Sequence, residues 1–116
     1  MHDICHVEIA STDVEGSMAF LGGLFGWSFE EMGPNYRLFR PGEGPGGGIM
    51  KVEAPAGPGG VSMYIHVAKI EETLERVPGL GGAVVRPRTA IDGGHGWYAI
   101  LRDPGGSEIG VWEAPK

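Results

Sequence analysis

The sequence predicts an α+β fold made of two βαβββ modules, and three observations support this prediction. A Pro-Gly-Gly turn, a short apolar run and Glu-Ala-Pro occur at 45–55 and again at 104–115. Each half of the chain also has one amphipathic helical pattern, and each half places one strand before it and three strands after it. Because one such module would leave an apolar sheet face exposed, two modules are expected to pack together in one domain.

The spacing between the two halves is regular. Apolar helix positions recur 56 residues later, as Val14 and Ile70, Met18 and Leu74, and Leu21 and Val77. The last strands are 60 residues apart, as shown by Ile49 and Ile109, which indicates longer middle loops in the second half. The repeat predicts a first module at about 1–55, a linker rich in glycine and proline at 54–60, and a second module at 61–116.

The first module is expected to begin with a strand and a capped helix. Residues 4–10 alternate apolar and polar side chains, as a half-buried strand does. Thr12 and Glu15 match a capping box, which predicts a helix start at 11–13. The apolar face of this helix would contain Val14, Met18, Leu21 and Phe25, and glycines at 22, 23 and 26 would end it. Strands are expected at 28–32, 36–40 and 49–53, with a glycine-rich loop at 41–48.

The second module repeats this order. A strand is expected at 62–67, followed by a helix that buries Ile70, Leu74 and Val77 and ends in the glycines of 79–82. Further strands are expected at 83–88 and 97–102, separated by a loop at 91–96. A turn at 103–106 then leads into the last strand.

Composition and charge exclude several classes of protein. The net charge is −6 and the sequence has no basic stripe, which argues against a nucleic-acid-binding protein. No apolar run is long enough to span a membrane, and residues 1–3 do not start a signal peptide, so a cytoplasmic protein is expected. The single Cys5 excludes an intrachain disulfide and is expected to behave as a small buried apolar residue.

Several motifs, taken in order, resemble the vicinal-oxygen-chelate superfamily, which includes glyoxalase I, bleomycin-resistance proteins and extradiol dioxygenases. Residues 9–27 resemble the opening strand and helix of that family, and 103–113 resemble its closing turn and strand. Residues 47–51 are similar to a glyoxalase-like or hydroxylase-like subgroup. The resemblance covers the whole chain. It implies a cupped eight-stranded sheet arrangement with two outer helices, and a homodimer.

Metal-using members of that family place one ligand on the first strand and one on the last strand of each module. The resemblance carries these positions onto His6, Met50, Ser62 and Gly110. Zn, Ni, Fe or Mn at such a site needs imidazole or carboxylate ligands, and His6 is the only residue of the four that supplies one. We therefore expect no metal cofactor at the family position.

A displaced site is the alternative. Glu8 shares a strand face with His6, and His66 shares one with Ser62, so that His6, Glu8 and His66 could converge on one point. His95 could reach such a point from its loop. These groups could hold a shifted metal ion or form a His6–Glu8 acid–base pair. The reading we favour is that they are polar side chains lining a solvated cleft.

Aromatic side chains give the remaining candidates for ligand binding. Tyr64 and Tyr98 could face a cavity and offer area and hydroxyl groups to a small organic molecule, or they could serve ordinary sheet packing. The candidate ligand-binding set is therefore Met50, Ser62, Tyr64, His66, Tyr98 and Gly110.

Three functions follow from these observations. The first is a metal-free protein that binds a small molecule, as bleomycin-resistance proteins do, with a weak preference for cations from its acidic charge. The second is a lyase, isomerase or dioxygenase that uses His6 and Glu8, with or without His66. The third is a non-catalytic part of a larger assembly. The sequence does not decide whether the protein is an enzyme.

Overall fold

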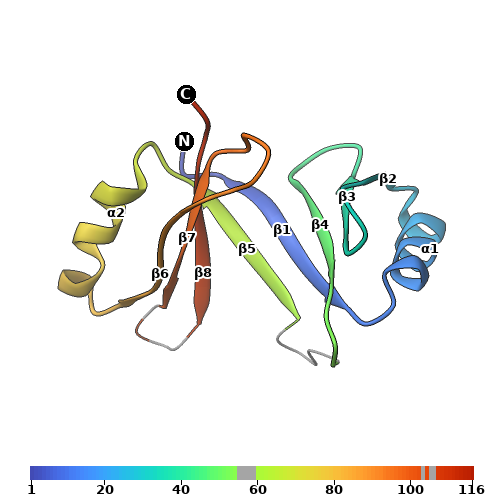
Figure 1. Ribbon diagram of the computed structural model, residues 1–116, viewed down its shortest axis with the longest axis horizontal. Coiled ribbons are helices and arrows are strands. Elements are labelled where there is room, and N and C mark those ends of the chain that lie inside the picture. Colours follow the sequence, from blue (N-terminus) through green and yellow to red (C-terminus); the bar gives the residue numbers. More distant parts are fainter. Residues whose placement is uncertain (55–59, 103, 105–106) are drawn as a thin grey trace. The chain divides into compact units, whose positions relative to one another are not determined.

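The structure is a computed structural model that describes residues 1–54, 60–102, 104 and 107–116 (Figure 1). The predicted linker at 54–60 therefore lies outside the described residues except at its two ends. The predicted turn at 103–106 also lies outside them, apart from Pro104.

The described residues form eight strands and two helices in the predicted order, which confirms the α+β fold of two βαβββ modules. The first module comprises β1 (Ile4–Ser11), α1 (Val14–Phe25), β2 (Ser28–Glu31), β3 (Tyr36–Arg40) and β4 (Gly46–Lys51). The second comprises β5 (Val61–His66), α2 (Ile70–Arg76), β6 (Ala83–Ala90), β7 (Trp97–Arg102) and β8 (Glu108–Glu113), with a short 3-10 turn at Pro78–Leu80 after α2.

The chain forms two compact units, which we call the N-terminal unit (Cys5–Ser62) and the C-terminal unit (Met63–Lys116 with Met1–Ile4). The first four residues join the C-terminal unit because His2 N donates to the His66 carbonyl at 2.8 Å and His66 N donates to the Asp3 carbonyl at 3.0 Å.

The two units share one pattern of strand pairing. The strand order is β2-β3-β4-β1 in the N-terminal unit and β5-β8-β7-β6 in the C-terminal unit. In each unit the last strand of the module pairs parallel to the first strand and antiparallel to the third. The two halves that repeat in the sequence therefore also have the same strand pairing.

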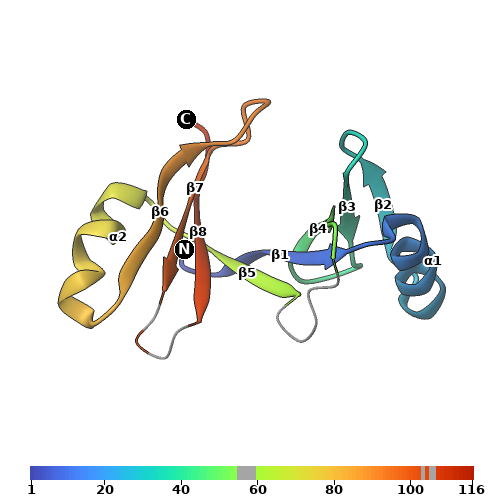
Figure 2. The same ribbon diagram turned by 60° about the horizontal axis from the view of Figure 1, so that its bottom comes forward.

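The core of the N-terminal unit lies between α1 and one face of its strands (Figure 2). Val14, Phe39 and Ile49 are buried there, and the Trp27 ring stacks on Phe39 with 4.6 Å between ring centroids. Phe25 was predicted to belong to the apolar face of the helix, but its side chain does not join this core and is 60% exposed. It occupies the last turn of α1, where its ring leans on Trp27 at 5.7 Å instead of reaching the sheet.

The cap of α1 is Asp13 and not Thr12, so the predicted capping box is wrong by one residue. Asp13 Oδ1 accepts a hydrogen bond from Gly16 N at 3.0 Å, the third amide of the helix. Ser11 Oγ accepts from Asp13 N at 3.0 Å and holds the cap in place. Glu15, the other half of the predicted box, pairs instead with Arg37 at 3.0 Å.

Strand β4 begins three residues earlier than predicted and ends at Lys51, two residues before the predicted end. Its first residues, Gly46–Gly48, belonged to the predicted loop, but they pair with His6–Glu8 of β1 on one side and with Leu38 and Phe39 of β3 on the other. Pairing on both edges outweighs the low strand propensity of glycine. A side chain at Gly47 would collide with the Val7 carbonyl and the Phe39 ring, so glycine lets these strands approach.

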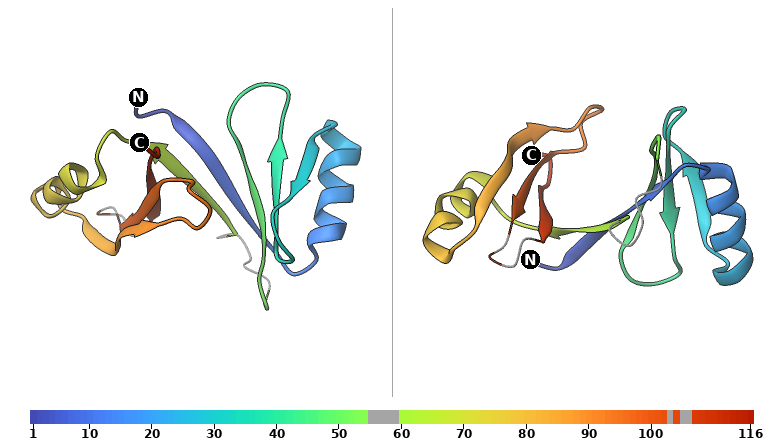
Figure 3. Two further views of the ribbon diagram at one scale, coloured as in Figure 1. Left: turned by 45° about the horizontal axis from the view of Figure 1, so that its top comes forward. Right: turned by 90° about the horizontal axis from the view of Figure 1, so that it is seen from below.

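The core of the C-terminal unit lies between α2 and one face of its strands (Figure 3). Val67, Ile70, Ala99 and Val111 are buried, with Leu74, Trp97 and Leu101 packed around them. No helix in the described part of the chain is long and apolar enough to cross a membrane.

Helix α2 begins without a capping side chain of its own, because Lys69 makes no cap hydrogen bond. The buried carboxylate of Glu113, at the end of β8, accepts from Ile70 N at 2.8 Å in its place. Arg88 also donates to Glu113, at 3.1 and 3.4 Å, and its guanidinium lies 4.1 Å from the centre of the Trp97 ring. Hydrogen bonds from Arg88, with that of Ile70 N, hold the pKa of Glu113 below its usual value of 4.5, although burial opposes this.

Candidate functional site

A triangle of polar side chains lies on the face of the N-terminal sheet that α1 does not cover. His6 Nε2 lies 2.6 Å from Glu8 Oε2 and 2.9 Å from the Tyr36 hydroxyl, and that hydroxyl donates to Glu8 Oε2 at 3.0 Å. The side chains of His6 and Glu8 are 30% and 17% exposed, so the group is partly withdrawn from water yet accessible. We call these three residues the His6 triangle.

The hydrogen bonds of the His6 triangle are mutually consistent when His6 carries its proton on Nε2. That N–H then points at both neighbouring oxygens, while Tyr36 gives its own proton to Glu8. Glu8 Oε2 accepts both protons. The arrangement links an imidazole, a carboxylate and a phenol within one hydrogen-bond network, the kind of grouping that can exchange protons with a bound molecule.

Gly48 makes this triangle possible. It pairs with Glu8 on β1 and with Leu38 on β3, so it lies between the two strands that supply the triangle. A side chain there would collide with the ring and hydroxyl of Tyr36. Because Gly48 has none, the Tyr36 ring crosses β4 and reaches Glu8 and His6.

The C-terminal unit presents an aromatic surface on the face that α2 does not cover. The Tyr64 ring lies over Gly110 and meets Tyr98 edge-on at 6.4 Å between ring centroids. The His66 ring lies 5.0 Å from Trp112, and the Arg86 guanidinium lies 5.9 Å from the centre of the Tyr98 ring. We call this surface the Tyr64 face.

Gly48 and Gly110 hold equivalent places in their modules. Gly48 pairs with Glu8, and Gly110 pairs with Tyr64, which lies 56 residues after Glu8, the same spacing as between the helices. Each glycine is covered by a tyrosine ring. The pairing thus makes Gly48 the counterpart of Gly110, whereas the sequence motif had matched Met50 to it.

The structure brings together some of the predicted residues. His6 meets Glu8, and Tyr64 meets both Tyr98 and Gly110. His66 packs on Trp112 within the Tyr64 face. Met50 is 40% exposed and pairs with Ala10 and Tyr36 in the sheet, and Ser62 is exposed. The His95 carbonyl accepts from Trp112 Nε1 at 2.8 Å. Convergence of His66 with His6 and Glu8 stays a prediction.

Sequence reasoning missed two residues of these surfaces, Tyr36 and Trp112. Tyr36 was assigned only to a strand, and its role depends on Gly48, which is twelve residues away and lies in a stretch predicted as loop. The sequence feature that could have indicated this contact is a tyrosine on one strand and a glycine on the neighbouring strand, because the glycine lets the tyrosine ring cross to the strand beyond.

The residues at the family's metal positions do not fit a divalent ion. Of His6, Met50, Ser62 and Gly110, only His6 offers an imidazole, and replacing Met50 by Gly48, as the strand pairing indicates, adds no ligand. The Nε2 atom of His6 already bonds to Glu8 and Tyr36. The place where a side chain at position 110 would begin is filled by the Tyr64 ring. Among the described residues, no group of three or more His, Cys, Asp or Glu side chains is placed to hold a metal.

Comparison with known proteins assigns the fold. The mycobacterial protein named "Putative glyoxylase CFP32" of Mycobacterium bovis is 26% identical over 127 residues, which cover 95% of this chain and 45% of that protein. The same protein of Mycobacterium tuberculosis gives equal values. The chain thus spans less than half the length of the curated relatives it matches.

Solved structures agree on the fold. Methylmalonyl-CoA epimerase from Mycobacterium tuberculosis superposes with a TM-score of 0.77 at 16% identity, covering 98% of this chain and 89% of that one. Homoprotocatechuate 2,3-dioxygenase from Brevibacterium fuscum gives a TM-score of 0.76 at 17% identity, covering 98% of this chain and 37% of that one. The model of the Glyoxalase/Bleomycin resistance protein/Dioxygenase superfamily matches residues 3–111. The chain therefore belongs to the glyoxalase/bleomycin resistance protein/dioxygenase superfamily.

Proposed function

We propose that this chain binds a small organic molecule through the His6 triangle of its N-terminal unit, without the metal centre of its family. The observation that carries the proposal is the His6 triangle itself. Three polar groups are linked by hydrogen bonds on the sheet face that α1 does not cover, and His6 and Glu8 remain partly exposed. Polar groups placed this way orient a ligand by hydrogen bonding. The Tyr64 face of the C-terminal unit, taken by itself, offers aromatic contact area through Tyr64 and Tyr98.

The donor set at the family positions supports the metal-free part of the proposal. A thioether, a hydroxyl and a position without a side chain are poor ligands for Zn, Ni, Fe or Mn. His6, the one good donor, is held by Glu8 and Tyr36. The residues of the chain would then recognise a ligand by hydrogen bonding and stacking.

Metal content tests this part directly. The purified protein should contain far less than one equivalent of Zn, Ni, Fe or Mn after expression in metal-rich medium, and the value should not change in His6→Ala. Stoichiometric metal in the wild type that is lost in His6→Ala would overturn the metal-free proposal.

Ligand binding is tested with a thermal-shift screen of small aromatic and cationic compounds. Any compound that raises the Tm of the wild type should raise it less in Tyr36→Phe, because the variant loses the hydroxyl that bonds to His6 and Glu8. Arg40→Gln is the matched control, since Arg40 is 65% exposed and pairs with Glu30. A screen without any stabilising compound would count against binding, as would equal shifts in both variants.

An enzyme is the second candidate, and the shared proton network of the His6 triangle favours it. An imidazole beside a carboxylate and a phenol is suited to move a proton to or from a bound substrate. The curated relatives are named as glyoxylases, and one structural neighbour is an epimerase. Such an enzyme should lose turnover by about 100-fold or more in His6→Gln and in Glu8→Gln while resisting chelators. Turnover that chelators abolish would refute this mechanism.

Association with another chain is the third candidate, and we propose a homodimer as its simplest form. Sedimentation of the purified chain tests it, because a dimer should show twice the mass of 12.3 kDa. A mass equal to that of one chain across the accessible concentration range would reject the homodimer.

A further inference from the structure

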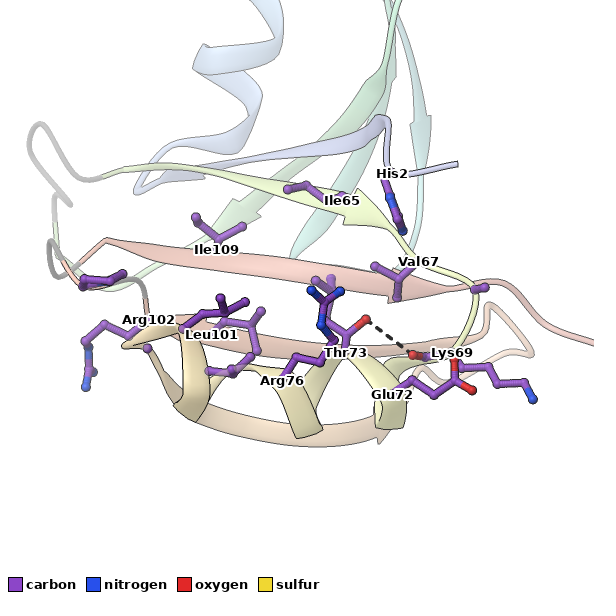
Figure 4. A pocket seen from close by; sticks show the side chains of 16 residues that line it. His2, Ile65, Val67, Lys69, Glu72, Thr73, Arg76, Leu101, Arg102 and Ile109 are labelled. Carbon is purple, nitrogen blue, oxygen red and sulfur yellow. Dashed lines mark hydrogen bonds between the residues drawn. The ribbon is translucent and has the colours of Figure 1, made fainter.

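The C-terminal unit contains a pocket that is separate from the Tyr64 face. It lies on the helix side of the sheet, between α2 and the strands β5, β7 and β8, and has a volume of about 590 Å³ (Figure 4). Helix α2 has only seven residues, whereas α1 has twelve. The short helix leaves part of the sheet face beside it uncovered.

The floor of this pocket is apolar. It is formed by side chains that alternate along the strands with those of the Tyr64 face, namely Ile65, Val67, Leu101, Ile109 and Val111. Val77 and Leu80 extend it at the end of α2. Apolar surface of this kind favours a ligand with a hydrocarbon or aromatic body.

The rim of the pocket carries positive charge, although the chain has a net charge of −6. Three of the nine Lys and Arg residues line it, Lys69, Arg76 and Arg102, together with His2 and one acid, Glu72. Figure 4 shows the Arg76 guanidinium extending over the floor and the His2 ring pointing toward the pocket from the other side.

The other charged groups of the rim lie farther from the centre. Arg102 turns outward, where it pairs with Glu108 at 3.3 Å, and Lys69 and Glu72 lie at one end of α2 (Figure 4). Arg76 is thus the cation best placed to meet a ligand on the apolar floor.

We propose that this pocket binds a small monocarboxylate with an apolar body, such as a medium-chain fatty acid. The guanidinium of Arg76 would pair with the carboxylate through two parallel N–H donors, and His2 would lie beside it. The hydrocarbon chain would cover Ile109 and Leu101. A pocket with one central guanidinium and an apolar floor matches one negative charge and a hydrocarbon tail better than a phosphate, which needs more donors.

Titration followed by amide NMR spectra of the whole chain tests the proposal, with decanoate as the probe. Decanoate should shift resonances of α2, β8 and the first residues of the chain, with saturation in the millimolar range or below. Decylammonium has the same tail and the opposite charge, and acetate has the same charge without the tail. Each should bind at least about tenfold more weakly than decanoate.

Arg76→Gln should weaken decanoate binding by about tenfold or more, because it removes the guanidinium and its charge but keeps a polar side chain. The matched control Arg40→Gln changes an exposed arginine of the N-terminal unit and should leave the affinity unchanged. Amide spectra of both variants establish that they fold.

Four outcomes would overturn the proposal. Decylammonium could bind as tightly as decanoate, Arg76→Gln could retain the wild-type affinity, or the shifts could fall on the His6 triangle and the Tyr64 face instead of the pocket. Concentration-dependent shifts of the pocket residues without decanoate would also overturn it, because they would assign the pocket to a second copy of the chain. Shifts on the His6 triangle would overturn the pocket proposal while supporting ligand binding at Tyr36, and the other outcomes leave the metal content and binding at Tyr36 untouched, so the two proposals fail separately.

Discussion

Replacing Glu113 by glutamine removes the charge that joins α2 to the end of β8. The Glu113 side chain is 9% exposed and accepts from Ile70 N at 2.8 Å and from Arg88 at 3.1 and 3.4 Å. Glutamine keeps the shape and one acceptor oxygen, so the bond to Ile70 N can persist. Arg88, 29% exposed, then has an amide in place of a carboxylate as its partner.

The stability lost in Glu113→Gln follows from the difference in strength between charged and neutral hydrogen bonds. A bond to a charged group contributes about 1.5–3 kcal/mol, and a neutral one contributes about 0.5–1.5 kcal/mol. Because the Arg88 side chain is 29% exposed, water can hydrogen-bond to its guanidinium and offset part of the lost interaction with Glu113. We expect Glu113→Gln to lower the free energy of unfolding by about 1.5 kcal/mol, and the Tm by roughly 6 °C for a chain of this size.

The assay is urea unfolding at several pH values, followed by circular dichroism. Because the folded-state pKa of Glu113 is held below 4.5, the contribution of its charge is complete above that pH and is lost as the pH falls through the folded-state pKa. The difference between the wild type and Glu113→Gln should therefore be constant near neutral pH and shrink on acidification. A difference that grows as the pH falls would contradict the assigned direction of the pKa shift.

Glu108→Gln is the matched control. Glu108 pairs with Arg102 at 3.3 Å, but the two side chains are 54% and 48% exposed. Exposed pairs contribute little, so the control should change the free energy of unfolding by less than about 0.5 kcal/mol. Equal costs for Glu113→Gln and Glu108→Gln would refute the argument that burial and the helix amide make Glu113 special.

Two further predictions concern the N-terminal unit. Gly48→Ala should lower the free energy of unfolding by about 2 kcal/mol and displace the Tyr36 ring, whereas Gly23→Ala, where a side chain would meet nothing within 4 Å, should raise it by about 0.5 kcal/mol. Equal effects of the two changes in urea unfolding would reject the close packing of the ring. Asp13→Ala should lower the free energy of unfolding by about 1 kcal/mol and Thr12→Ala by less than about 0.5 kcal/mol, because Asp13 is the N-cap. A larger loss in Thr12→Ala than in Asp13→Ala would favour the capping box predicted from the sequence.

Local patterns predicted most of the fold. Alternation placed β3 at 36–40 and β7 at 97–102, the bounds that the structure shows, because these strands have one buried and one open face. The start of β4 could not be found this way. Glycines at 46–48 have no side chains to alternate, and only pairing with β1 and β3 makes them a strand.

The candidate site was less predictable than the fold. The alternation of the first strand predicted that His6 and Glu8 share one face, and their side chains do lie within hydrogen-bond distance there. Tyr36 completes the triangle only because Gly48 lets its ring cross a strand, which is a contact between residues whose pairing the sequence did not reveal. The cap at Asp13 was missed because Thr12, Asp13 and Glu15 offer competing hydrogen bonds that sequence patterns do not rank.

The tyrosine ring over Gly110 also constrains how this chain could change. Metal-using members of the superfamily carry a ligand at the position that the resemblance assigns to Gly110, so Gly110→Glu is the simplest change that would add a carboxylate there. The Tyr64 ring fills the space that the new side chain would need, and the single change would therefore first damage the sheet. A carboxylate at position 110 would therefore require a smaller residue at position 64 as well, so the two substitutions depend on each other and the first one alone lowers stability.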